Sequence, residues 1–243
     1  MPTEKMRIEQ RQLSQSGFTI LEDVLAPHEI ELWLEELDKL FGTNKVAIKN
    51  RQGAVYAARN ILADLPQCCD ISQIPQLADL LTETLGDDYG LVRGLYFDKH
   101  PERTWSLPWH KDLTIAVKDN TLPTEQFCKP TTKSGIAHVE ASEQVLARML
   151  TLRVHLDPVT EENGPLEVAV GSHANGKLPD DASHQVAKTL TRAGGVLAMR
   201  PMLSHASGSS SPGTKMHRRI LHLEFAADRE LPDGYQWHQF ISN

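Results

Sequence analysis

Short extended segments dominate the chain from about residue 91 onward, and this change of pattern limits the folds open to it. Before that point, apolar residues recur at helical spacing in residues 27–41 and 74–85, where Pro27 suits a first turn and Gly86 a helix end. After it, apolar and β-branched residues form runs without helical spacing. We predict strands at residues 91–98, 109–117, 149–157, 166–170, 196–203 and 218–226.

This order of segments predicts a mainly β fold with flanking helices, namely an antiparallel double-stranded β-helix, or cupin-like jelly roll. An α-rich part would occupy about residues 1–90, and the jelly-roll core about residues 91–230. Because no stretch rich in Pro, Gly and Ser divides the 243 residues, we expect a single domain over residues 1–243.

Composition and net charge limit the kinds of molecule that this protein is expected to bind and the compartment in which we expect it. A net charge of −7 argues against nucleic acid, whose phosphates favour a basic surface. The first residues lack the apolar run of a signal peptide and no stretch approaches membrane-spanning length, so we expect a cytoplasmic protein without membrane contact. The three cysteines, two of them adjacent, indicate neither a disulfide framework nor a cysteine metal site. The oligomeric state is left open.

A His-x-Asp pair lies in the predicted strand 109–117. Because successive side chains of a strand alternate, His110, Asp112 and Thr114 would share one face. Two histidines and one carboxylate on one face of an octahedral metal leave three positions for a chelating oxoacid and dioxygen. A calcium or magnesium site would use more carboxylates and no histidine, whereas a tetrahedral zinc site is harder to exclude.

The third metal ligand must come from a histidine further along the chain. The candidates are His138, His155, His173, His184, His205, His217 and His222. His205 is favoured by context, because it follows the predicted strand 196–203 and precedes a Ser/Gly loop and then a strand that begins with Arg218. That order suits a dicarboxylate that chelates the metal at one end and pairs with an arginine at the other.

Four motifs in the same order resemble the phytanoyl-CoA dioxygenase family of iron(II)- and 2-oxoglutarate-dependent oxygenases. They are residues 17–34, 107–112, 162–173, and His205-Ala-Ser207 with Arg218. The resemblance implies that His110, Asp112 and His205 bind Fe(II). It also implies that Ser207 and Arg218 bind the distal carboxylate of 2-oxoglutarate, with Arg219 as the alternative if the register shifts by one residue. Thr114 is a further candidate for a cosubstrate contact.

The resemblance implies a dioxygenase that uses Fe(II), 2-oxoglutarate and O₂ to hydroxylate a small-molecule metabolite, with release of succinate and CO₂. The carboxylate of Asp112 favours hydroxylation, or a desaturation that shares its first step, because related halogenases have Ala or Gly there. Two alternatives stay open. One is a non-catalytic jelly roll that binds a metal or a small acid; the other is a cupin-type metal-dependent isomerase or hydrolase, in which Arg218 would have no assigned role.

The substrate is not predicted by the sequence, which offers only candidate contacts. These are Arg59, Asn60, Trp105, Trp109 and Arg153. Along residues 149–156, Thr151, Arg153 and His155 alternate with apolar residues, so Arg153 faces either the barrel mouth or solvent. Residues 118–144 are long for a connection between strands, and we predict a lid or substrate-selecting loop there, with a disordered excursion as the alternative.

Overall fold

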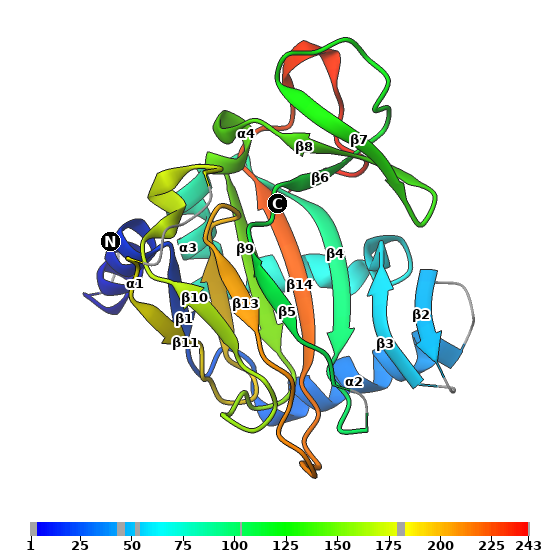
Figure 1. Ribbon diagram of the computed structural model, residues 1–243, viewed down its shortest axis with the longest axis vertical. Helices are drawn as coiled ribbons and strands as arrows, with labels where there is room; N and C mark the ends of the chain where they lie inside the picture. The colour runs from blue at the N-terminus through cyan, green and yellow to red at the C-terminus, as the bar shows by residue number, and fades with distance from the viewer. Residues whose placement is uncertain (1–3, 43–46, 52–53, 103, 179–182, 243) are drawn as a thin grey trace.

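Two antiparallel sheets packed face to face form the centre of the computed structural model, which describes residues 4–42, 47–51, 54–102, 104–178 and 183–242 (Figure 1). The larger sheet has the order β1-β12-β9-β14-β4-β3-β2, and β15 also pairs with β4. Its strands are β1 (Phe18–Leu21), β2 (Ala47–Arg51), β3 (Ala54–Arg59), β4 (Gly90–Asp98), β9 (Met149–His155), β12 (Val196–Met199), β14 (Arg219–Ala226) and β15 (Ile241–Ser242).

The facing sheet is smaller and has the order β11-β10-β13-β5. Its strands are β5 (Leu107–His110), β10 (Leu166–Ala169), β11 (Val186–Lys188) and β13 (His205–Ser207). Leu166 and Val168 of β10 pack against Leu197 and Met199 of β12, so apolar side chains hold the two sheets together at one end. This arrangement confirms the predicted jelly roll, because two antiparallel sheets face each other around a shared interior.

Helices cover the outer face of the larger sheet. They are α1 (Glu4–Ser16), α2 (Pro27–Gly42) and α3 (Pro75–Leu85), with the short helices η1 (Ile61–Ala63) and η2 (Pro66–Gln73) between them. Leu37 of α2 and Leu81 of α3 belong to one apolar core with Leu152 of β9 and Leu223 of β14. Since side chains alternate along a strand, the intervening residues of β9 and β14 point the other way, into the jelly roll.

A third, three-stranded sheet stands at one end of the molecule, at the top of Figure 1. It consists of β6 (Thr114–Val117), β7 (Phe127–Lys133) and β8 (Ile136–Ala141), and the short helix α4 (Glu143–Ala147) follows it. Tyr235 and Trp237 from the C-terminal segment, near the 3₁₀ helix η4 (Pro232–Gly234), pack into its apolar cluster. Residues 118–144 therefore do not form a disordered excursion, because most of them build a hairpin with its own core.

Two predicted strands are wrong in their extent. Residues 109–117 form two strands in different sheets, since the chain leaves β5 at His110 and enters β6 at Thr114. Between them, the amide of Asp112 donates to the carbonyl of Pro201 at 2.9 Å, and the carbonyl of Leu113 accepts from Ala141 at 3.0 Å. Likewise β12 ends at Met199, and a turn precedes β13 instead of one strand running to residue 203.

The predicted α-rich N-terminal part also contributes the strands β1, β2 and β3 to the larger sheet. The domain boundaries themselves stay a prediction. In the part of the chain that the structure describes, no helix has the length and apolar character needed to cross a membrane. The cysteines Cys68, Cys69 and Cys128 are all free thiols, as the sequence indicated.

Candidate metal centre

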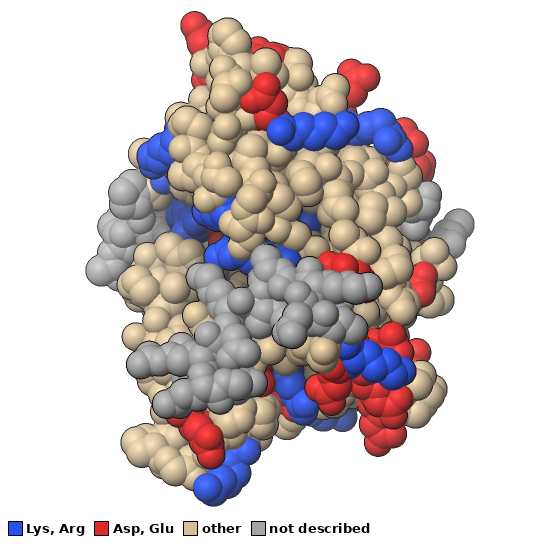
Figure 2. Space-filling model, turned by 90° about the vertical axis from the view of Figure 1, so that its right-hand side faces the viewer, with Lys and Arg blue, Asp and Glu red and all other residues tan. Residues whose placement is uncertain are grey.

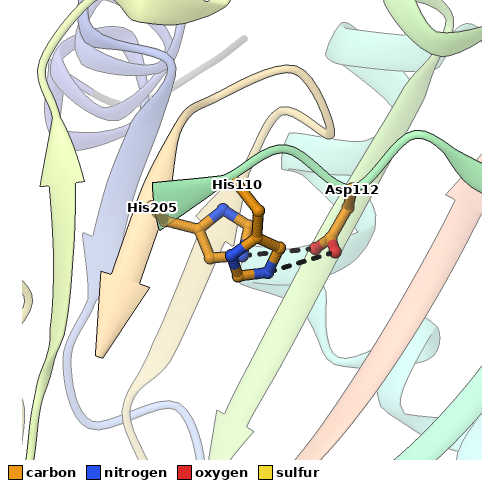
Figure 3. Close-up of side chains that lie close together, drawn as sticks. All are labelled: His110, Asp112 and His205. Carbon is orange, nitrogen blue, oxygen red and sulfur yellow. Dashed lines mark ion pairs between the residues drawn. The ribbon is translucent and has the colours of Figure 1, made fainter. Parts of the chain in front are cut away.

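Two neighbouring strands and the turn after one of them bring His110, Asp112 and His205 together. His205 of β13 lies directly opposite His110 of β5 in the strand register, and their ring centroids are 4.2 Å apart. Nε2 of His110 lies 3.9 Å from Oδ1 of Asp112, and Nε2 of His205 lies 3.6 Å from Oδ2 (Figure 3). Among the described residues, this is the group of three whose ligand atoms all lie within 4.8 Å of one another.

Backbone carbonyls fix which ring nitrogen of each histidine faces the carboxylate. Nδ1 of His110 lies 2.8 Å from the carbonyl of Pro108, and Nδ1 of His205 lies 2.9 Å from that of Leu203. When Nδ1 donates to a carbonyl, the lone pair of Nε2 is left for a metal. The donor set therefore fits a divalent transition metal, with two imidazole nitrogens and one carboxylate.

The protonation states agree with a ligand set. Burial lowers the pKa of His205 to about 4, despite the nearby Asp112 carboxylate. Burial raises the pKa of Asp112, but His205, His222 and His110 outweigh that effect and hold it at about 2. Both groups are thus deprotonated at neutral pH, as metal binding requires.

Three polar side chains lie together deeper between the sheets. Arg218 is only 5% exposed, and its Nε has no hydrogen-bond partner within the described structure. Lys99 is fully buried and donates to the carbonyls of Gly164 at 3.3 Å and Gly208 at 2.6 Å and to the hydroxyl of Ser207 at 3.3 Å. The Ser207 hydroxyl oxygen accepts from Lys99, so its hydrogen remains available to a ligand.

Burial and mutual repulsion weaken the proton affinity of these cations. Burial, followed by the charge of Arg153, lowers the pKa of Arg218 to about 9. Burial and the charges of Arg218 and Arg153 lower the pKa of Lys99 to about 7. The described residues give neither Lys99 nor Arg218 a carboxylate partner. Such buried cations without a counter-charge are costly unless an anion binds to them.

The adjacent residues Arg218 and Arg219 have different surroundings. Arg219 begins β14 and forms an ion pair with Asp157, with nitrogen–oxygen distances of 2.7 and 2.8 Å. Arg218, immediately before β14, lines the cavity that also holds the three metal-ligand candidates. Of the two arginines, Arg218 is therefore the one that lines the cavity.

Residues 13–217 match the model of one protein family, described as phytanoyl-CoA dioxygenase (PhyH). The chain belongs to this family. No curated protein sequence matched it significantly.

Solved structures of similar fold place the family membership in context. One is EctD from S. alaskensis with 2-oxoglutarate and 5-hydroxyectoine, 19% identical with a TM-score of 0.68, covering 93% of this chain and 76% of that one. Another is AviO1 from Streptomyces viridochromogenes Tue57, 21% identical with a TM-score of 0.65, covering 96% and 99%. A third is the α-ketoglutarate-dependent epimerase SnoN from nogalamycin biosynthesis, 16% identical with a TM-score of 0.67, covering 95% and 86%.

A cavity of about 310 Å³ opens beside the three metal-ligand candidates. Of the predicted contact residues, Arg59, Trp105, Thr114, Arg153, Ser207 and Arg218 line it. Arg153 is only 7% exposed, so the alternative that it faces solvent is wrong.

Asn60 and Trp109 do not line the cavity, and both expectations need correction. Asn60 adopts a left-handed conformation, with φ of 59°, and begins the short helix η1. Trp109 is 47% exposed and neighbours His110 on the strand β5, where the alternation of side chains turns it away from the metal site.

A chain of polar contacts crosses the cavity floor, and sequence reasoning missed it. Arg153 donates to Nδ1 of His222 at 3.1 Å, and Nε2 of His222 lies 3.3 Å from Glu224. Glu224 in turn pairs with Arg93 at 3.1 Å. The alternation of His222 and Glu224 with apolar residues in residues 218–226 was the available signal, because it marks one polar face of that strand. Lys99 offered no such signal, since a lysine that closes an apolar strand is usually exposed.

Proposed function

We propose that this protein is an Fe(II)- and 2-oxoglutarate-dependent dioxygenase that hydroxylates a small-molecule metabolite and releases succinate and CO₂. The observation that carries the proposal is a single cavity that holds the His110, Asp112 and His205 cluster together with the buried Arg218. Family membership supports the same function. So do two similar structures of EctD, one with bound Fe and one with 2-oxoglutarate and 5-hydroxyectoine.

The chain's residues would divide the work between metal and cosubstrate. His110, Asp112 and His205 would bind iron and leave three coordination positions open. Arg218 would pair with the distal carboxylate of 2-oxoglutarate, and the hydroxyl of Ser207, held by Lys99, would donate to it. When bound, iron with 2-oxoglutarate supplies the activation of O₂ needed to cleave a C–H bond.

Charge balance supports this assignment. An Fe²⁺ ion, the Asp112 carboxylate and the 2-oxoglutarate dianion together carry one negative charge, which Arg218 neutralises. Without that dianion, Arg218 would stay buried without a counter-charge. Because Asp112 occupies the carboxylate position, no ligand position is vacated for a halide, so we favour hydroxylation over halogenation.

Anaerobic addition of iron(II) and 2-oxoglutarate tests the cosubstrate site directly. We expect a visible metal-to-ligand charge-transfer band, lost in Asp112→Ala and His205→Ala. Absence of the band in the wild type would favour a non-catalytic jelly roll or a cupin-type isomerase or hydrolase, neither of which consumes 2-oxoglutarate.

A turnover screen against a metabolite library tests the reaction. We expect succinate release under O₂ to rise with particular metabolites, and the product to gain one oxygen atom from O₂. The product must be identified by mass spectrometry, because two proteins of similar structure are an epimerase and a carbocyclase. A product that lost two hydrogens, or was isomerised, would contradict hydroxylation while leaving the oxygenase class intact.

A further inference from the structure

The cavity wall carries far more positive than negative charge. Its cations are Arg59, Arg93, Lys111, Lys133, Arg153 and Arg218, against the two carboxylates of Asp112 and Glu224. Figure 2 shows lysine and arginine atoms inside the recess on the side of the molecule where β3 and β4 lie. A bound metal would use Asp112, which leaves Glu224 as the remaining acid.

Most of these cations already have a partner. Arg93 pairs with Glu224 at 3.1 Å, and Arg153 donates to His222 at 3.1 Å. Lys111 donates to the carbonyls of Ser172 at 3.2 Å and Gly176 at 2.9 Å. Arg218 is assigned above to 2-oxoglutarate. Arg59 and Lys133 remain, and the side chain of neither makes a hydrogen bond or ion pair with the residues that the structure describes.

Separate elements bring these two cations to the same place. Arg59 ends β3 and lies opposite Leu95 of β4, whereas Lys133 ends β7 at the tip of the β7–β8 hairpin. Both are partly buried. Burial, followed by repulsion from Arg93, lowers the pKa of each, and the charge of Arg59 lowers that of Lys133 further.

The charges that act on these two cations differ from those that act on Arg218. Arg93 and Glu224 are the charges that act on both Arg59 and Lys133, and Asp112 also acts on Lys133. Arg218 shares its surroundings instead with Arg153 and Lys99. Arg59 and Lys133 are thus two partly desolvated cations that line one cavity without an ion-pair partner, an arrangement that favours binding of an anion.

We propose that Arg59 and Lys133 bind a carboxylate or phosphate group of the primary substrate, which is therefore a small organic acid or phosphate ester. That the bound anion is a substrate rests on the proposed dioxygenase function, whereas the binding of an anion by these two residues does not. The guanidinium of Arg59 suits a bidentate contact with an oxyanion, and the ammonium of Lys133 adds a point charge from the hairpin. The hairpin thus becomes part of the substrate site.

Ligand-observed saturation-transfer NMR tests this on zinc-loaded protein with saturating 2-oxoglutarate. The probes are organic acids and phosphate esters. Each acid is compared with its neutral primary amide, and each phosphate ester with its parent alcohol. We expect some anions, and none of their neutral counterparts, to bind. In the double variant Arg59→Gln/Lys133→Gln, their affinity should fall at least about tenfold, as expected for lost charge-assisted hydrogen bonds. The relative strength of acids and esters identifies the anion.

The matched control is Lys129→Gln, on the same strand, where Lys129 pairs with Glu140 on the surface at 2.7 Å. It should bind the anions like the wild type. In the double variant, the 2-oxoglutarate dissociation constant should stay within about twofold, which also shows that the variant is folded. Anion binding that survives in the double variant, or the absence of any anion binding, overturns the inference. A loss of 2-oxoglutarate affinity would reassign the pair to the cosubstrate.

Succinate release with iron and O₂ separates this inference from the function on which it rests. Anion binding without succinate from any probe would defeat the proposed dioxygenase and leave the anion site standing. Succinate release that is stimulated best by a neutral molecule would support the dioxygenase and contradict the inferred anionic substrate.

Discussion

Two adjacent arginines with different surroundings offer the sharpest test at the scale of single residues. Arg218→Ala removes the buried cation from the cavity, and we expect the 2-oxoglutarate dissociation constant to rise on the order of 100-fold, or about 3 kcal/mol. Arg219→Ala removes the ion pair with Asp157, so it should cost about 1–3 kcal/mol of stability and leave 2-oxoglutarate binding unchanged. Titration of the charge-transfer band measures both. Equal effects of the two variants would contradict the assignment.

Lys99 should make stability depend on pH in a defined window. Its pKa is about 7 in the folded protein, below the ordinary value of 10.5, because of burial and the neighbouring arginines. The unfolded chain therefore holds the proton more tightly. Unfolding takes up a proton between about pH 7 and 10.5, so the contribution of Lys99 to stability rises with pH across that window and is lowest below pH 7.

Urea unfolding of the metal-free protein and of Lys99→Met, at pH 6.5 and pH 9.5, checks this prediction. The wild type should gain stability relative to the variant at the higher pH, by up to a few kcal/mol. The hydrogen bonds lost in Lys99→Met lower the free energy of unfolding similarly at both pH values. The change with pH in the stability difference between wild type and variant therefore reports the ionisation of Lys99. A difference that is the same at both pH values would mean that Lys99 does not titrate in this window.

At the scale of elements, the tip of the β7–β8 hairpin depends on two residues with positive φ. Ser134 has a φ of 50° and Gly135 a φ of 79°, which suits the two-residue turn between paired Lys133 and Ile136. Gly135→Val should cost about 1 kcal/mol or more locally, because a β-branched residue resists this conformation. Amide hydrogen exchange should accelerate in β7 and β8 but not in β9 or β14. Ser134→Asn, which tolerates positive φ, is the control and should exchange like the wild type.

The element scale also shows where sequence reasoning ends. The metal motif was found because His110 and Asp112 are two residues apart, which brings side chains together in an ideal strand. In the structure the strand ends at His110, yet the side chains of His110 and Asp112 still converge. The amide of Asp112 donates to the carbonyl of Pro201, which fixes the turn after the strand. Alternation along one strand carries no information about a bond to a distant carbonyl. For the same reason, the hairpin in residues 118–144 was mistaken for a loop: its strand β7 is mostly exposed and lacks an apolar face.

At the scale of the whole molecule, the sequence predicted the jelly roll from its alternating strands, but not which polar faces meet inside it. Arg153 on β9, His222 on β14 and Arg93 on β4 are far apart in the chain, and only the strand order β9-β14-β4 makes them neighbours. Pairing across a sheet is set by topology, which a single sequence does not display. The residues that line the substrate side of the cavity can therefore be identified only from the three-dimensional fold.

The metal ligands and the cosubstrate arginine lie on opposite sheets, which predicts how ligands stabilise the whole fold. His110 and His205 belong to the smaller sheet, whereas Arg218 leads into β14 of the larger one. A divalent metal alone should raise the melting temperature, and 2-oxoglutarate should add a further increase only when metal is present, since it would join the two sheets. At 100 times its dissociation constant, each ligand contributes about 2.7 kcal/mol, or roughly 5–10 °C for a chain of this size.

Differential scanning fluorimetry with nickel(II) in place of iron measures both increments. In Arg218→Ala the metal increment should persist, and the 2-oxoglutarate increment should fall to about 0.4 kcal/mol if the dissociation constant rises 100-fold. If 2-oxoglutarate stabilised the metal-free protein equally well, it would not bind by bridging the metal and Arg218.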